Sequence, residues 1–256
     1  MDATSFYDRL APLFDMMTDW DSRLEFEGPF LCRLLEQAGA RAVLDAACGS
    51  GGHALALARW GYRVVGTDIS PVMVALAREK AGEAQVAFHV AGLGELASRF
   101  SPFDAVLCLG NSLPHLLTEA ELQMALQDLA SSLRPDGLLV LHNLNYDRRW
   151  RERPRWFAVS AGTHQGRQAL VWRFADYIDT PQPRIDFHIA LFHEQSDGQW
   201  TSEVHSTPQR PLFRADLARL LPAAGMTDIA YYGDLSGAAF DPDNSPDLVV
   251  VARRSR

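Results

Sequence analysis

The sequence has little cysteine, no long apolar run and no excess of positive charge. Its three cysteines, Cys32, Cys48 and Cys108, are too few and too far apart to predict a disulfide framework or a zinc knuckle. No uninterrupted apolar stretch approaches the roughly 18 residues of a membrane-spanning helix. The N-terminus also lacks the basic and apolar segments of a secretion signal. These absences predict a cytoplasmic protein that does not act at a membrane.

The charge balance argues against nucleic acid as a partner. The 256 residues include 24 Lys and Arg against 32 Asp and Glu, which gives a net charge of −8. Negative charge opposes nonspecific binding to phosphate backbones. With 47% hydrophobic and 22% charged residues, the composition is that of a folded globular chain. The length suits one large domain or a domain that carries an insertion.

Short apolar runs and helical patterns alternate in the first part of the chain. The runs predict strands over residues 41–47, 62–68, 85–91, 103–110 and 137–145. Five strands separated by helices predict an α/β fold, in which a mostly parallel sheet carries helices on both faces.

The pattern changes after Asn145. Residues 169–179, 184–195 and 199–207 are typical of antiparallel strands, and Asp197-Gly198 predicts a hairpin turn. A helical pattern and two further strands then resume the α/β alternation. The chain therefore divides into an N-terminal helical cover (1–40), a core (41–145), an inserted antiparallel β cap over the carboxyl ends of the sheet, where open α/β folds bind ligands (146–212), and a C-terminal completion of the core (213–256).

A glycine turn follows the first predicted strand. Residues 49–54 fit the loose pattern GxGxxA, which suits a dinucleotide or an adenosyl ligand because glycine lets the backbone approach a ligand closely. Asp68, at the end of the second strand, suits the ribose of either ligand. Asp45, by contrast, would repel a pyrophosphate and attract a sulfonium or amino group. The charges favour a cationic ligand.

With these residues the sequence resembles the class I S-adenosylmethionine-dependent methyltransferases. The segments VLDAACGSG, GTDIS, FDAVLCLG and LRPDGLLVL are similar to four motifs of that family, in the same order. The resemblance implies a Rossmann-like sheet with an antiparallel last strand, S-adenosyl-L-methionine as cofactor, S-adenosyl-L-homocysteine as product, and no metal. The cofactor-binding residues that it implies are Arg23, Asp45, Ala47, Gly49, Gly51, His53, Asp68, Ile69, Met73, Gly92, Leu93, Leu109, Asn111 and Ser112.

The resemblance also assigns roles to these residues. It implies that Gly49 and Gly51 approach the methionine part of the cofactor and that Asp68 binds its ribose. Ile69 and Met73 would pack near the adenine. The family often has an acidic residue after the third strand, where it binds the adenine amino group. Here the segment is Ala91-Gly92-Leu93. We therefore expect backbone groups of Gly92 and Leu93 to bind the adenine amino group instead.

Two further segments resemble the glycine and sarcosine N-methyltransferase branch of the family. They are CLGNSLPHL and LNYD, and they imply that Asn145 binds an amino-acid acceptor beside Tyr146. The branch has an arginine for the methionine carboxylate at the position of Arg23, and aromatic N-terminal residues over the site, which makes Tyr7 a lid residue. His142 departs from the branch, which often has an acidic residue there.

Methyl transfer from a sulfonium is an in-line displacement that depends mainly on positioning. The catalytic residues expected for it are Tyr7, His115 and Asn145. Two alternatives stay open: Tyr7 as an anchor that packs the N-terminal segment onto the core, and His115 as a structural or cofactor-facing histidine. An amino-acid acceptor also requires a cation for its carboxylate, because a buried unpaired charge is costly. Arg173 or Arg184, in the predicted cap strands, would provide that cation. The small-molecule acceptor expected from the resemblance is the amine of glycine, sarcosine or a similar metabolite.

Other interpretations stay open. The aromatic residues of the cap line a pocket for a larger natural product, methylated on oxygen or nitrogen, or they form the core of the inserted sheet; they are Trp150, Trp156, Phe157, Trp172, Phe174 and Trp200. A third possibility is a catalytically silent S-adenosylmethionine-binding protein. A homo-oligomer is possible. His188 and His193 are an odd number of residues apart and would point to opposite faces of a strand, which argues against a metal site.

Overall fold

The computed structural model describes residues 1–256 and contains a seven-stranded sheet with the order β10-β11-β5-β4-β1-β2-β3. β11 pairs antiparallel with both of its neighbours, and the remaining pairs are parallel. The strands are β1 (Ala42–Ala46), β2 (Arg63–Asp68), β3 (Val86–Val90), β4 (Phe103–Cys108), β5 (Leu133–Leu144), β10 (Met226–Tyr232) and β11 (Asp247–Arg254). The predicted α/β class, with an antiparallel last strand, is confirmed.

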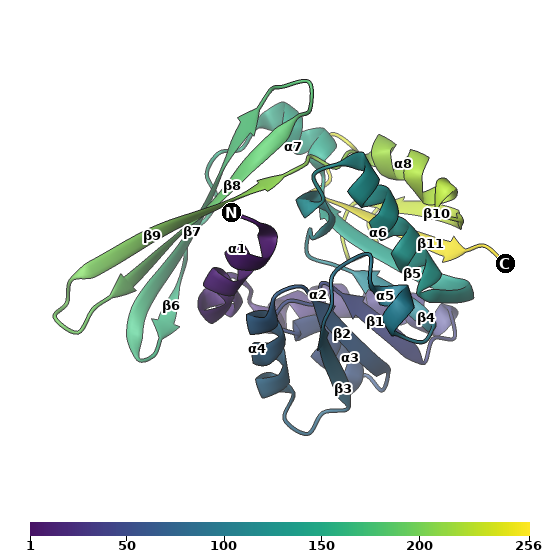
Figure 1. Cartoon of the computed structure of the whole chain (residues 1–256), viewed down its shortest axis with the longest axis horizontal. Coiled ribbons are helices and arrows are strands. Elements are labelled where there is room, and N and C mark those ends of the chain that lie inside the picture. The colour runs from purple at the N-terminus through teal and green to yellow at the C-terminus, as the bar shows by residue number, and fades with distance from the viewer.

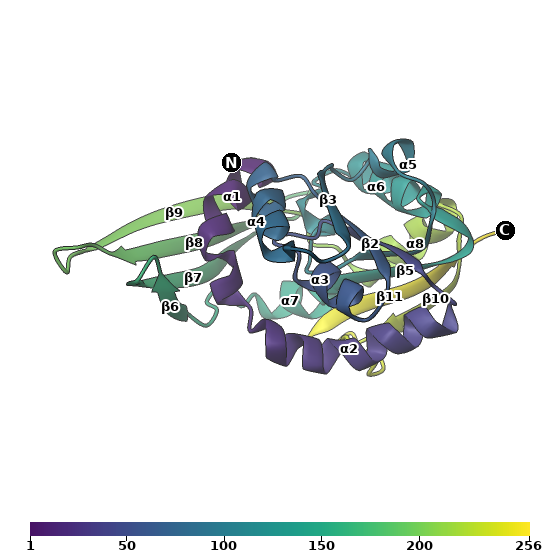
Figure 2. The same ribbon diagram turned by 90° about the horizontal axis from the view of Figure 1, so that it is seen from below.

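Helices cover both faces of this sheet. One face carries α2 (Trp20–Gln37), α3 (Gly52–Arg59) and α4 (Pro71–Ala81), and the other carries α5 (Leu96–Arg99), α6 (Glu119–Ser131) and α8 (Arg214–Ala223). Figure 2 shows α2 and α3 on the side opposite α5 and α6. Because side chains alternate along a strand, Val43 packs into one apolar layer and Leu44 into the other, and both are fully buried. None of the helices has both the length and the apolar content needed to cross a bilayer.

A second, antiparallel sheet forms the cap. Its strands are β6 (Ser160–His164), β7 (Arg167–Ile178), β8 (Arg184–Glu194) and β9 (Trp200–Gln209). The expected hairpin turn is present between β8 and β9, with Gly198 at φ +80°. Ile185 and Ile189 are buried, as the alternation along β8 predicted. In Figure 1 the cap extends away from the seven-stranded sheet.

The N-terminal segment joins the two sheets. It consists of α1 (Ala3–Leu10) and a 3₁₀ helix, η1 (Ala11–Met17). Phe6, Leu10 and Leu13 form a small apolar core with side chains of β7 and β8. On its other side, the Ser70 hydroxyl donates a 2.5 Å hydrogen bond to Asp8. Figure 1 shows α1, in purple, between the cap and α4. The segment is thereby held over the carboxyl ends of β1 and β2.

Two elements of the cap were not expected from the sequence. β6 is an edge strand with little apolar alternation, so it lacks the pattern of a half-buried strand. α7 (Tyr146–Glu152) is a short, charged helix, which Asn145 caps by accepting a hydrogen bond from the Arg148 amide. This helix turns the chain from β5 into the cap.

Candidate functional site

Two cavities meet over the carboxyl ends of the parallel strands, where open α/β sheets bind ligands. The first, here called the sheet cavity, has a volume of about 240 Å³ and is lined by the strand ends and the glycine turn. The second, the cap cavity, has a volume of about 520 Å³ and is lined by α7, the cap strands and the N-terminal segment. The residues that line both are Tyr7, Phe14, Arg23 and Gly110. The two cavities are therefore adjacent and share these four residues as a common wall.

The sheet cavity gathers most of the side chains expected to bind a cofactor. Those that line it are Arg23, Asp45, Ala47, Gly49, His53, Asp68, Ile69, Met73, Gly92, Leu93, Leu109 and Ser112. Gly92 and Leu93 line it as the resemblance implied, and Ile69 presents an apolar side chain that is 48% exposed.

Two of the expected residues do not line the sheet cavity. Gly51 begins α3 in the left-handed region (φ +84°), and a Cβ there would lie 2.9 Å from the Phe88 ring, so this glycine permits internal packing. Asn111 lines the cap cavity instead. Its side chain accepts a 3.0 Å hydrogen bond from the Leu144 amide and donates one of 3.0 Å to the Tyr146 hydroxyl.

Backbone amides fix the carboxylate of Asp68. It accepts a 2.8 Å hydrogen bond from the Gly49 amide and a 2.9 Å hydrogen bond from the Ser70 amide. Burial raises the pKa of Asp68 above its ordinary value, although these two hydrogen bonds oppose the shift. Each carboxylate oxygen has a second lone pair. The side chain can therefore accept ribose hydroxyls while it holds the glycine turn in place.

Asp45 is a buried carboxylate with an unused oxygen. It is only 1% exposed, and its Oδ2 atom has no hydrogen-bond partner. Burial raises the pKa of Asp45 to about 7; a hydrogen bond that the carboxylate accepts from the Ala54 backbone amide lowers it, and the nearby charge of Asp68 raises it. A cationic group in this cavity would stabilise the ionised carboxylate. The side chain is thus suited to an ammonium or sulfonium, as its position in the sequence predicted.

Arg23 is oriented by a carboxylate that the sequence analysis missed. The Arg23 Nε group donates to Glu27 over 2.8 Å, and His53 Nε2 donates to the other oxygen of Glu27 over 2.6 Å. Burial alone would raise the pKa of Glu27, but the His53 hydrogen bond and the Arg23 charge hold it below its usual value. Burial lowers the pKa of His53. The spacing of four residues between Arg23 and Glu27 on one helix was the available signal.

Tyr7 and His115 stand where the cavities join. The Tyr7 hydroxyl lies 2.9 Å from His115 Nε2, and the Gln209 side-chain nitrogen lies 3.3 Å from the same atom. Burial lowers the pKa of His115 to about 4, so its imidazole is neutral at neutral pH. Because the Gln209 amide nitrogen can only donate, we assign Nε2 as the acceptor and the ring proton to Nδ1, which is buried and has no hydrogen-bond partner. Tyr7 then donates to His115 and presents its oxygen lone pairs for a ligand.

Besides Arg23, which pairs with Glu27, the cap cavity contains two further guanidinium groups. Arg173, one of the two arginines expected to bind an acceptor, lines it and has a buried Nε atom without a hydrogen-bond partner. Arg149, on α7, was not expected. Tyr146 lines the same cavity from α7, as expected beside an acceptor. Burial lowers the pKa of Arg173, and the charge of Arg149 lowers it further.

Two residues that were expected to bind the acceptor lie outside both cavities. Asn145 is fully buried and lines neither cavity; its amide donates to the carbonyls of Pro242 (3.1 Å) and Ser245 (3.0 Å) and thereby holds the loop before β11. Arg184 is at the exposed start of β8 and pairs with Asp186 over 2.9 Å. Neither side chain can reach an acceptor in this arrangement.

The aromatic residues of the cap separate into two groups. Among them, only Phe157 lines the cap cavity. Trp156 and Trp172 stack on each other with ring centroids 5.1 Å apart, and Trp156 is 57% exposed. Trp172 alternates along β7 with Val171 and Arg173, so it lies on the face turned away from the N-terminal segment. The idea that these tryptophans together line an acceptor pocket was wrong.

Comparisons with known proteins identify the family of this chain. Residues 43–137 match the family described as "Methyltransferase domain". The glycine/sarcosine N-methyltransferase of Halorhodospira halochloris is 37% identical over 252 residues, which cover 96% of this chain and 87% of the relative. The enzyme of the same name from Parasynechococcus marenigrum is 32% identical over 237 residues, which cover 90% and 78%.

The fold is also found among solved structures. An S-adenosylmethionine-dependent methyltransferase from Clostridium acetobutylicum superposes with a TM-score of 0.77 over 98% of this chain and 99% of that one, at 13% identity. That likeness shows the fold. Together with the sequence relatives, it shows that the chain belongs to the class I S-adenosylmethionine-dependent methyltransferases, in the group that includes the glycine/sarcosine N-methyltransferases.

Proposed function

We propose that this protein transfers the methyl group of S-adenosylmethionine to the amine of a small acceptor that carries a carboxylate, of which glycine and sarcosine are the simplest. The observation that carries this proposal is that two adjacent cavities contain side chains of opposite charge. The sheet cavity contains the carboxylates of Asp45 and Asp68, and the cap cavity contains the unpaired guanidinium of Arg173. A cationic cofactor and an anionic acceptor are the ligands that such a pair of cavities accommodates.

The residues of the sheet cavity fit the cofactor part by part. The unused oxygen of Asp45 suits its cationic end, and Asp68 suits its ribose. Ile69 and Met73 supply an apolar surface for the adenine, and Arg23 supplies a cation for the carboxylate of the methionine part. When bound, S-adenosylmethionine supplies a methyl group that is already activated on a sulfonium.

The cap cavity positions the acceptor and removes its amine from water. In this proposal Arg173 binds the acceptor carboxylate, and the amine lies toward Tyr7, at the junction of the cavities. Removal from water lowers the pKa of an ammonium, so the amine reaches the neutral form that attacks. With a pKa of about 4, His115 does not store the released proton; it orients the Tyr7 hydroxyl instead. Correct placement alone is worth roughly 7–11 kcal/mol in such reactions.

The relatives support an amino-acid acceptor. Glycine/sarcosine N-methyltransferase is the name of three proteins that align with nine-tenths or more of this chain. The same geometry accommodates a hydroxyl acceptor less well, because a hydroxyl does not become a nucleophile through desolvation alone and His115, with a pKa of about 4, is a weak base. Nitrogen is therefore the proposed methyl acceptor.

The test measures cofactor binding and methyl transfer separately. Calorimetry would give the affinity for S-adenosylmethionine, and mass spectrometry would detect S-adenosylhomocysteine and methylated product with glycine, sarcosine and glycolate. We expect methylation of glycine or sarcosine and none of glycolate, which replaces the amine by a hydroxyl. Methylation of glycolate in preference to glycine, or cofactor binding without transfer to any amine, would contradict the proposal.

A further inference from the structure

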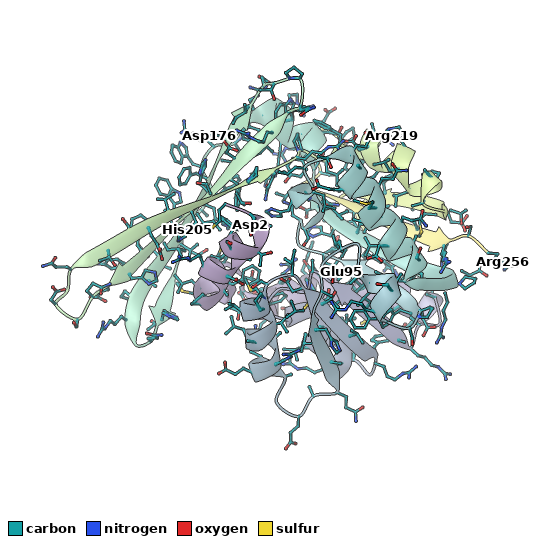
Figure 3. The ribbon with its side chains drawn as sticks, viewed as in Figure 1. Asp2, Glu95, Asp176, His205, Arg219 and Arg256 are labelled. Carbon is teal, nitrogen blue, oxygen red and sulfur yellow. The ribbon has the colours of Figure 1, made fainter.

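One arginine of α7 differs from its neighbours in having no carboxylate partner. Residues 148–155 include five arginines. Four of them form ion pairs: Arg148 with Glu152, Arg151 with Asp243, Arg153 with Asp179, and Arg155 with Asp176. Asp176 is labelled in Figure 3 on the cap sheet. Arg149 is the exception, and it is also the one that lines the cap cavity.

Aromatic side chains hold Arg149 toward the cavity. It follows Tyr146 by three residues, which places both on one face of α7. Its guanidinium carbon lies 5.3 Å from the centre of the Phe157 ring, an arrangement that orients the planar group without neutralising it. The Phe157 amide in turn donates a 3.1 Å hydrogen bond to the Arg173 carbonyl. The two arginines are thus carried by one local structure.

The cap cavity therefore has two positive charges in excess. Its only carboxylate is that of Glu27, which is already shared by Arg23 and His53. Arg149 and Arg173 are each half-buried and have no acidic partner. A single carboxylate, as in glycine, would neutralise one of them. Like charges held together away from water are costly unless a ligand compensates them.

The volume of the cap cavity also indicates an acceptor larger than glycine. Its volume of about 520 Å³ is about twice the 240 Å³ of the sheet cavity. Apolar side chains from β8, Ile185, Phe187 and Ile189, line the wall that the charged groups leave free. The cavity has room for an acceptor longer than glycine.

We infer that Arg149 and Arg173 form a two-part anion site, and that the preferred acceptor is an amine carrying two anionic groups, such as an acidic or phosphorylated amino acid. This inference rests on the proposed function, since it concerns the acceptor of that reaction. Arg173 binds one anionic group and Arg149 the second. Guanidinium groups bind carboxylate and phosphate through paired hydrogen bonds, so both sources share the required chemistry.

The test compares acidic acceptors with their neutral counterparts. The kcat/KM for methylation would be measured for aspartate against asparagine, glutamate against glutamine, and O-phosphoserine against serine. We expect at least one acidic member to exceed its neutral counterpart by about tenfold or more, the size of a charge-assisted hydrogen bond. A preference confined to O-phosphoserine would identify phosphate as the second group, and a preference for aspartate or glutamate would identify a carboxylate.

Three variants assign that preference to Arg149. Arg149→Gln should abolish the preference for the acidic members over their neutral counterparts, and Arg149→Lys should restore part of it. Arg151→Gln, which removes an arginine paired with Asp243, serves as the matched control and should leave the preference intact. Equal rates for acidic and neutral members, or a preference that persists in Arg149→Gln, would overturn the inference.

A binding measurement separates this inference from the proposed function. Calorimetry of the same six compounds with protein saturated with S-adenosylhomocysteine does not require turnover. Binding of an acidic member that Arg149→Gln weakens about tenfold would support the anion site even if no amine were methylated, in which case only the proposed function would fail. If no acidic member binds better than its neutral counterpart, the anion site is wrong.

Discussion

The two cavities differ in how the chain builds them. In the sheet cavity, backbone amides at the strand ends hold the functional carboxylate of Asp68, and the ligand-facing residues come mostly from one stretch of the chain. In the cap cavity, side chains from the N-terminal segment, α7 and the cap strands converge, and its charges come from Arg149 and Arg173. The first site depends on backbone geometry and the second on side-chain identity. Relatives that share the first can therefore differ in the second.

The largest effect, on cofactor affinity, is expected at Asp68, whose carboxylate binds backbone amides and, in the proposal, the ribose. Asp68→Ala removes two hydrogen bonds to the glycine turn and the proposed ribose contact. Charge-assisted hydrogen bonds contribute about 1.5–3 kcal/mol each, so the Kd for S-adenosylmethionine should rise about 100-fold or more by calorimetry. Asp104→Ala is the control, since Asp104 also accepts two backbone amides but lines neither cavity. Similar weakening by both variants would show a general loss of structure.

Asn145 tests whether the loop before β11 is separate from the acceptor site. Asn145→Ala removes the cap of α7 and the hydrogen bonds to Pro242 and Ser245. Losses of about 1 kcal/mol for each predict that the free energy of unfolding falls by about 2–3 kcal/mol in denaturant titrations. Asn244→Ala, in the same loop but exposed, should change it by less than about 0.5 kcal/mol. If Asn145→Ala left the free energy of unfolding unchanged but abolished turnover, Asn145 would belong to the acceptor site.

The charge of Asp45 should make cofactor affinity depend on pH. Its raised pKa of about 7 means that the carboxylate is ionised above pH 7 and protonated below it. The attraction for a cationic ligand is therefore present at pH 8 and lost as the pH falls through 7. A tenfold change corresponds to one pKa unit, so calorimetry should show about tenfold weaker binding at pH 6 than at pH 8. Asp45→Asn should give a flat profile; a pH dependence that persists in this variant would exclude Asp45 as its source.

The smallest effect is expected at the junction of the cavities. Tyr7→Phe removes one hydrogen bond to His115, worth about 1 kcal/mol. The value of kcat should fall about fivefold, while the Kd for S-adenosylmethionine stays within about twofold. Tyr62→Phe, which lines neither cavity, should change neither. A loss of cofactor affinity equal to the loss of kcat would place Tyr7 in the cofactor site alone.

The sequence predicted the sheet cavity well for a physical reason. Strand ends and the turns after them meet at one edge of a parallel sheet, so the positions of Asp45, Gly49 and Asp68 in the sequence indicate their positions in space. Gly51 was the misassigned member of this group, because a glycine required for packing against Phe88 looks the same in a motif as one required by a ligand.

The cap cavity was predicted less well because its members converge only through tertiary packing. Arg173 was recognised as one of two choices, but its alternation along β7 did not show which face would meet the N-terminal segment. Arg149 was missed because α7 was not predicted, and only the position of that helix distinguishes Arg149 from the other arginines nearby. Asn145 was placed in the site by resemblance, whereas its hydrogen bonds are all internal.

The most direct test of the opposite charges in the two cavities compares two acceptors that differ in one group. Glycine and glycinamide share the amine, and only glycine has a carboxylate. With saturating S-adenosylmethionine, kcat/KM should be at least about tenfold higher for glycine, and Arg173→Gln should reduce that ratio toward one. Equal kcat/KM for the two amines in the unmodified protein would contradict an anion-binding cap cavity.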